Sequence, residues 1–123
     1  MNIDKSHLYA SPDAFFDLNG SVNMRLSPLA AMQVCAESAH RGLVIARVEG
    51  GIWHAPGFES RLDCIWDGQD PPLDQDQASG NNQEAARFIA SQTPAHGVFI
   101  LTASPLAGSP AGRTGPASCS PAD

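Results

Sequence analysis

The chain has 123 residues and a formal net charge of −6, which fits one domain with a single modest core. The shortage of Lys and Arg argues against direct binding to nucleic acid or to anionic membrane surfaces. No apolar run approaches the roughly 20 residues that span a bilayer, and the first ten residues lack the basic and apolar regions of a signal peptide. We therefore expect a cytoplasmic location.

Residues 1–25 are mixed in character, and we expect a partly ordered N-terminal extension. Within it, Ala14-Phe15-Phe16 can pack on the core, and Ser11-Pro12-Asp13 can begin a turn or a short helix. A clear helix begins at Ser27-Pro28, because Ser is a good N-cap and Pro suits the first helical position. We expect it to end at Gly42. Its apolar residues recur at helical spacing and predict a buried stripe: Leu29, Met32, Cys35, Ala36 and Ala39.

Two strands are expected next. Leu43–Glu49 is rich in β-branched residues, and Gly50-Gly51 is typical of a turn at its end. Phe58–Trp66 shows period-two alternation, which predicts a second, antiparallel strand with a core face and a charged face. The core face would carry Phe58, Ser60, Leu62, Cys64 and Trp66, and the charged face Glu59, Arg61, Asp63, Ile65 and Asp67.

The remaining elements complete an α+β fold. Asn81 followed by Glu84 resembles a capping box and predicts the start of a second helix. Residues 97–103 are continuously apolar in their middle, which favours a central strand. Residues 104–123 are mostly Ser, Pro, Gly and Ala, so we expect a disordered tail. The predicted domain, residues 26–103, is a small sheet of about three or more mostly antiparallel strands packed against two helices, in the order α-β-β-α-β after the N-terminal extension.

The sequence offers few candidates for catalysis or metal binding. The cysteines and histidines form no CxxC or HxxxH pair, so we expect neither a disulfide framework nor a metal site, and no cofactor. Cys35 and Cys64 lie on apolar faces and are interpreted as core residues with free thiols. His54 can act as a general base with Glu49 or Asp63, which leaves a small hydrolase-like enzyme as an alternative.

Residues 59–76, called the acidic strip below, hold nearly all of the net charge. The strip contains six acids and one base, Arg61, whereas the rest of the chain is close to neutral. Such a strip can be a solvated surface, but ordinary surfaces mix charges of both signs. Trp66 lies inside the strip and Trp53 lies near it. Because tryptophans surrounded by charge are typical of interface hot spots, the strip indicates a surface that meets a basic partner. The strand parity favours a core position for Trp66 and an exposed one for Trp53.

The central part of the chain resembles the colicin-E5 immunity proteins. The resemblance covers residues 26–102 and depends on features that recur in order with compatible spacing: Ser27-Pro28, Val34-Cys35, Gly42-Leu43, Gly50-Gly51, Trp53, Pro56-Gly57-Phe58, Trp66 and Asn81-Asn82. The strand after Phe58 departs from the family pattern at Glu59, Arg61 and Asp63, which points to a different cognate toxin.

The resemblance implies an immunity protein that is not an enzyme. Such a protein binds a ribonuclease toxin that cuts tRNA at the anticodon, of a colicin or contact-delivered type. It blocks the basic RNA-binding cleft, with carboxylates in place of phosphates and a Trp in place of a base. A homodimeric interaction module is a further alternative, and the free chain is expected to be a monomer or weak dimer. The candidate toxin-binding residues are Glu49, Trp53, His54, Glu59, Arg61, Asp63, Trp66, Asp67, Asp70, Asp74 and Asp76.

Overall fold

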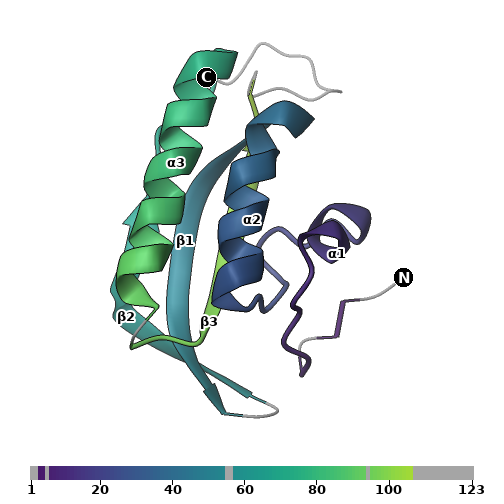
Figure 1. Cartoon of the computed structure of the whole chain (residues 1–123), viewed down its shortest axis with the longest axis vertical. Helices are drawn as coiled ribbons and strands as arrows, with labels where there is room; N and C mark the ends of the chain where they lie inside the picture. Colours follow the sequence, from purple (N-terminus) through teal and green to yellow (C-terminus); the bar gives the residue numbers. More distant parts are fainter. Residues whose placement is uncertain (1–2, 5, 55–56, 94, 107–123) are drawn as a thin grey trace.

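The computed structural model of this chain describes residues 3–4, 6–54, 57–93 and 95–106. Helices α2 (Pro28–Ser38) and α3 (Gln75–Gln92) lie side by side against one face of a three-stranded sheet (Figure 1). Both pairings in the sheet are antiparallel and the strand order is β2-β1-β3. This confirms the predicted α+β class and the order α-β-β-α-β. The strands are β1 (Leu43–His54), β2 (Gly57–Asp67) and β3 (Val98–Pro105).

The start of α2 forms as the sequence predicts, but the predicted buried stripe is wrong at Leu29 and Ala36, which are exposed. The Ser27 side chain accepts a hydrogen bond from the Ala30 amide at 3.2 Å, and Pro28 occupies the first turn. A short 3-10 helix, η1 (Ala39–Arg41), extends α2 and ends at Gly42, whose φ of 76° suits glycine. The sharp end of this helix lets the chain enter β1 at once.

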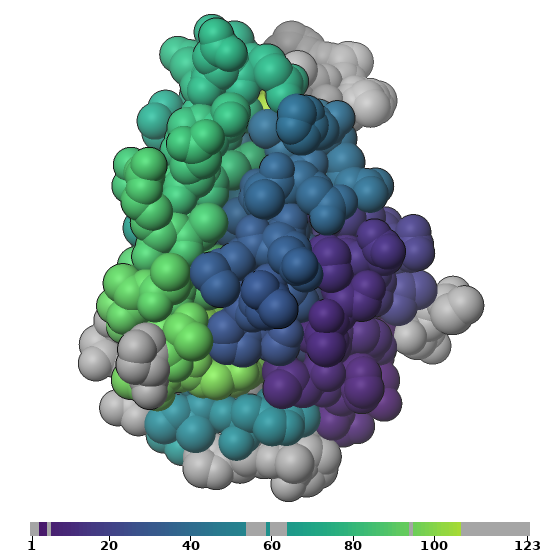
Figure 2. Space-filling view, viewed as in Figure 1, coloured from purple at the N-terminus to yellow at the C-terminus, as the bar shows by residue number. Residues whose placement is uncertain are grey.

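The described N-terminal residues are part of the core. Helix α1 (Pro12–Asp17) is capped by Ser11 and buries Phe15 in the main hydrophobic core cluster. Met24, which follows this helix, is buried in the same cluster. The segment then runs along the outer edge of β3, where Leu26 exchanges both backbone hydrogen bonds with Phe99. In Figure 2 this N-terminal part covers the side of α2 that faces away from α3. The extension therefore covers one edge of the sheet.

The predicted position of β3 in the sheet is wrong. β3 was expected at the centre because Val98–Leu101 is continuously apolar, but β1 is the central strand. All four of these residues are nevertheless buried. β3 pairs with β1 on one side and is flanked by the segment around Leu26 on the other, so neither of its edges is open in this region. β3 thus has backbone partners on both edges and buried side chains on both faces, which gives it the apolar run expected of a central strand.

Gly50-Gly51 is not the predicted turn. Both glycines lie inside β1, which continues to His54, and the hairpin connection falls at residues 55–56, outside the described residues. Gly50 instead allows a close approach in the core. A Cβ atom there would collide with Cys64 Sγ and would lie 2.9 Å from Phe99 Cε1. Close approach of neighbouring atoms is one of the known reasons for a glycine within a strand.

The alternation predicted for β2 is broken by a register shift. Glu49 pairs with Ile65 but Gly51 pairs with Ser60, so two steps along β1 correspond to five along β2. Glu59 pairs with Ile52, whereas Asp67 pairs with Arg47. β1 pairs regularly with β3 from Arg47 to Gly51 and with β2 from Gly51 to His54. Because positions 47 and 52 of β1 differ in parity, Asp67 and Glu59 belong to opposite faces of the sheet. One continuous charged face is therefore the wrong expectation.

The predicted start of α3 is also wrong. The helix begins at Gln75 with Asp74 as its N-cap, and a capping box joins Asp74 and Gln77 in both directions. Asn81 and Asn82 lie within the helix and are buried. Neither α3 nor any other helix in the described ranges combines the length and apolarity needed to cross a membrane.

We expect Gly50→Ala to destabilise the protein by about 1–3 kcal/mol, the usual cost of forcing extra volume into a packed core. Gly97→Ala is the matched control, because a Cβ at Gly97 meets nothing within 4 Å. Urea unfolding of the two variants measures the difference. Equal stability of the two variants would contradict the close packing at Gly50.

Candidate functional site

The structure divides the predicted site residues between two ends of the sheet. The part of β1 that pairs with β2 extends from Arg47, opposite Asp67, to His54, opposite Gly57. This is a distance of roughly 23 Å at about 3.3 Å per residue. The hairpin end carries Trp53, His54 and Glu59, and Glu49 lies between the two ends. Arg61 and Asp63 lie in the irregular stretch of β2, and their side chains, like that of His54, are outside the described residues. The other end carries Trp66, Asp67, Asp70, Asp74 and Asp76.

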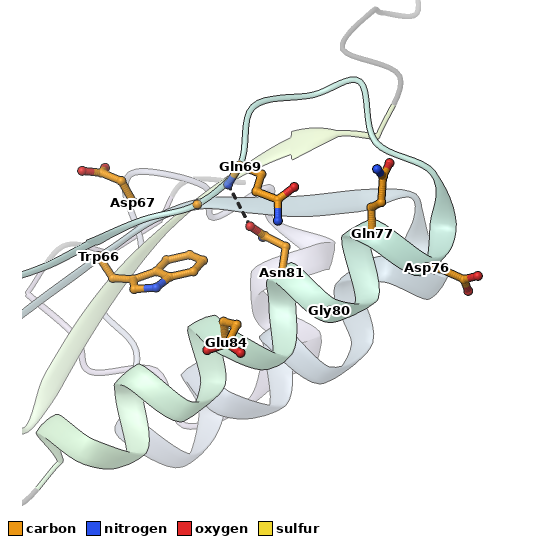
Figure 3. A pocket seen from close by; sticks show the side chains of 9 residues that line it. Trp66, Asp67, Gln69, Asp76, Gln77, Gly80, Asn81 and Glu84 are labelled. Atoms are coloured by element: carbon orange, nitrogen blue, oxygen red, sulfur yellow. Dashed lines mark hydrogen bonds between the residues drawn. The ribbon is translucent and has the colours of Figure 1, made fainter.

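An open groove of about 540 Å³, called the Trp66 groove below, lies at this second end. It separates the end of β2 and the following loop from the first half of α3 (Figure 3). In Figure 3 the indole of Trp66 and the Glu84 side chain lie next to each other, while Asp67 and Asp76 point outward at opposite ends of the groove. The lining residues are Trp66, Asp67, Gly68, Gln69, Asp76, Gln77, Gly80, Asn81 and Glu84.

The α3 wall of this groove follows from helical spacing. Gln77, Gly80, Asn81 and Glu84 stand at positions i, i+3, i+4 and i+7, so they share one face of the helix. A helix predicted to start at Asn81 does not contain Gln77 or Gly80, so this polar stripe is absent from the sequence prediction. A start at Asp74, indicated by the Asp74/Gln77 capping box, would have revealed it.

Trp66 has a dual position. It is half-buried and packs against the main core cluster, as its strand parity predicts, yet its ring also lines the groove. Trp53 is half-buried as well, rather than fully exposed, and its position along β1 places it on the sheet face away from α2 and α3. Trp66 is therefore the tryptophan that the fold brings together with the acids of the strip.

The groove has a negative charge, partly offset by exposed ion pairs. Three of its nine lining residues are acidic and none of those nine is Lys or Arg. Asp67 pairs with Arg47 at 2.8 Å, and Glu84 pairs with Arg87 at 2.6 Å. Both pairs are exposed, so each contributes at most about 1 kcal/mol. A cationic partner can exchange into such pairs at low cost.

Two acids of the strip have different roles. Asp74 is the N-cap of α3, with its side chain accepting from the Gln77 amide at 2.7 Å, so its carboxylate has a structural role. Asp76 lies in the first turn of the same helix, where the helix dipole favours negative charge. Asp70 is exposed in the connecting loop and does not line the groove.

The structure does not favour the first pairing of the hydrolase alternative. His54 and Glu49 stand five residues apart on β1, a backbone separation of roughly 16 Å along the strand. The side chains of His54 and Asp63 are outside the described residues, so the second pairing has no geometry to examine.

The described cysteines are core residues. Cys35 and Cys64 are both buried, as predicted. Burial raises the pKa of the Cys35 thiol to about 12, which suppresses the reactive thiolate. Cys119 lies outside the described residues. Within the described ranges no group of three or more His, Cys, Asp or Glu side chains is arranged to hold a metal ion.

Comparison with known proteins gives a single family. Residues 24–103 match the family described as Colicin-E5 Imm protein. The chain is 56% identical over 108 residues to Immunity protein CdiI of Burkholderia pseudomallei, an alignment that covers 88% of this chain and 99% of the relative. It is 35% identical over 80 residues to the Colicin-E5 immunity protein of Escherichia coli, covering 64% of this chain and 96% of the relative.

The fold and these similarities define a small α+β protein of the toxin-inhibitor class. The chain belongs to the colicin-E5 immunity family, so it is an immunity protein. This confirms the resemblance found in the sequence. It also favours an inhibitor over the enzyme alternative.

The raised pKa of Cys35 predicts a pH-dependent stability. The folded state keeps the thiol proton up to about pH 12, whereas the unfolded thiol loses it near pH 9.0. The contribution of the buried Cys35 thiol to the free energy of unfolding is therefore complete below pH 9.0. It is lost as the pH rises towards 12, by about 1.4 kcal/mol per pH unit for one proton. Urea unfolding of the unaltered protein and of Cys35→Ala between pH 8 and 10.5 measures it. The stability difference between them should shrink with pH, and a constant difference would contradict the assignment.

Proposed function

We propose that this protein binds and neutralises a cognate tRNase-like toxin by placing the Trp66 groove and its acidic surroundings in the toxin's basic RNA-binding cleft. The observation that supports this most directly is the groove itself, which an aromatic ring and Glu84 line, with Asp67 and Asp76 at its two ends, on a chain of an immunity family. The partner is a basic ribonuclease domain, and the relative named CdiI favours a contact-delivered toxin.

The chemistry of the groove fits a surface that binds the RNA-binding cleft of a ribonuclease. A ribonuclease cleft presents Lys and Arg to the phosphates of its substrate and flat surfaces to the bases. The carboxylates of Asp67, Asp76 and Glu84 match such cations, and the Trp66 ring offers a face on which a planar group can stack. The inhibitor thus imitates the charge and stacking of RNA with protein groups.

The proposal ranks the two ends of the sheet differently. The end that carries Trp66 combines an aromatic ring, acidic residues and a groove. Glu49, Trp53 and Glu59 are instead separated along β1 and β2 and lie on both faces of the sheet. We assign the main contact to the Trp66 groove and give the hairpin end a peripheral role. Electrostatic steering by the acids should speed association and make it sensitive to salt.

Filling the groove should abolish neutralisation without unfolding the protein. Gly80 lies in α3 with open space around its missing Cβ. Gly80→Ala should stabilise the helix by about 0.5–1 kcal/mol and leave toxin binding unchanged. Gly80→Gln places a long neutral side chain in the groove and should weaken binding at least a hundredfold. Calorimetric titration with the cognate ribonuclease toxin domain, and inhibition of its tRNA cleavage, provide the measurements.

The outcomes of this experiment separate three cases. Binding by the unaltered protein with equal affinity in both Gly80 variants would remove the groove from the interface. Failure of the unaltered protein to bind or inhibit the toxin domain at micromolar concentration would reject the proposed ribonuclease partner. Concentration-dependent mass of the free chain without toxin binding would favour the homodimeric module.

Charge removal should act more strongly at the groove than at the hairpin. Asp76→Asn combined with Glu84→Gln should weaken toxin binding at least tenfold and flatten the fall of the association rate with salt. Glu59→Gln is the control, because it removes an exposed charge from the other end of β2. Stopped-flow association at several ionic strengths measures both variants. A larger effect at Glu59 would move the docking surface to the hairpin end.

A further inference from the structure

Asn81 and Asn82 form a buried polar pair in the middle of α3. They are 3% and 2% exposed, although asparagine is a poor helix former and costs free energy to bury unless its amide is hydrogen-bonded. Neither residue caps the helix, which starts at Gln75. Their burial therefore requires another physical explanation, and their hydrogen bonds provide it.

Asn82 bonds to β1. Its side-chain oxygen accepts from the Ile45 amide at 2.9 Å, and its side-chain nitrogen donates to the Leu43 carbonyl at 3.1 Å. These groups lie where β1 and β3 change register, since Ile45 pairs with Ala103 but Arg47 pairs with Thr102. Asn82 thus provides partners for backbone groups at an irregular part of the ladder.

Asn81 bonds to β1 and also to the loop beside the groove. Its side-chain nitrogen donates to the Ile45 carbonyl at 2.9 Å and to the Asn82 side-chain oxygen at 3.1 Å. Its side-chain oxygen accepts from the Gln69 amide at 2.8 Å, the bond drawn in Figure 3. One side chain therefore connects three parts of the molecule: α3, β1 and the first residues after β2.

The loop start is closely packed between this amide and the tryptophan. A Cβ atom at Gly68 would lie 2.7 Å from Asn81 Oδ1 and 3.0 Å from Trp66 Cη2. The Gly68 amide also donates to the Ala46 carbonyl at 2.9 Å. Gly68 thus lies next to both Asn81 and the Trp66 ring, so the backbone at Gly68 and Gln69 connects the Asn81 amide to the ring on one side of the groove.

We propose that Asn81 is a positioning residue for toxin recognition, holding the loop at Gln69 and the ring of Trp66 in the arrangement that the toxin meets. This inference depends on the proposed function of the Trp66 groove. A groove fixed before binding loses less conformational entropy when the partner arrives, so its rigidity contributes to affinity. The side chain of Asn82, the next residue, bonds to Ile45, Leu43 and Asn81 but not to Gln69, which makes Asn82 the natural comparison.

The experiment compares Asn81→Ala with Asn82→Ala in a Trp53→Phe background, where Trp66 is the chain's remaining tryptophan. Both changes remove a buried amide and its bonds to β1, but only Asn81→Ala removes the bond to Gln69. Asn81→Ala should shift the Trp66 emission to longer wavelength and weaken toxin binding at least tenfold. Asn82→Ala should leave the emission unchanged and the affinity within about threefold at a temperature where both variants are folded.

The possible results distinguish this inference from the proposed function. Equal emission and equal affinity in the two variants would overturn the positioning role and leave the groove as the binding surface. A shifted emission with unchanged affinity in Asn81→Ala would overturn the groove as the binding surface, and this inference with it.

A measurement on the unaltered protein covers the case in which a variant fails to fold. The Gln69 amide should exchange its hydrogen slowly, at a rate close to that of Gly68, because Asn81 accepts its proton although the Gln69 residue is exposed. Exchange of the Gln69 amide as fast as that of an unstructured peptide would overturn the positioning role.

Discussion

The hydrogen bonds between α3 and β1 through Asn81 and Asn82 are the constraint on which the rest of the structure depends. They place α3 at a fixed height over the irregular start of β1, where the Ile45 amide and carbonyl both find side-chain partners. An apolar helix face could slide or rotate against the sheet, since hydrophobic contact has no direction. Two buried amides with fixed donors and acceptors give this contact a single register, and the position of the groove follows from it.

The groove is a consequence of how β2 leaves the sheet. After Asp67 the chain makes one more ladder bond, from the Gly68 amide to Ala46, and then turns towards α3 at Gln69. The return to the helix is closed by the capping box at Asp74, which fixes where α3 begins. Two acids of the strip, Asp67 and Asp76, therefore line one groove together with Glu84, because the loop and the start of α3 bring them to the same end of the sheet.

The sequence predicts the elements whose signals are local. Ser27 and Pro28 mark the start of α2 through capping and the fixed φ of proline, and the structure forms that cap. The antiparallel pairing of β1 and β2 and the order of elements also follow from local patterns. Cys35 and Cys64 are core residues for the same reason, since their neighbours at helix and strand spacing are apolar.

The features that were not predictable depend on contacts between distant residues. Gly50 has the sequence signal of a turn, but the reason for a glycine there is the nearby side chain of Phe99 in β3. The continuous burial of β3 depends on Leu26, which precedes it by more than 70 residues. Asn81 resembles a helix cap because asparagine caps helices well, whereas here its partners are Ile45 and Gln69.

For the same reason, the predicted positions of the site residues differ more from the structure than the predicted fold does. Strand parity assigned Glu59 and Asp67 to one surface, and a shift of three residues in register separates them. Helix periodicity, applied from the correct start at Gln75, assigns Gln77, Asn81 and Glu84 to one surface and brings them to Trp66. The charge of residues 59–76 is a property of the sequence, but the arrangement of Asp76 and Glu84 in space is set by the point where α3 begins. A relative with the same acids and a different helix start would present them in a different arrangement, so under the proposed function the cap at Asp74 would bear on partner choice as well as on stability.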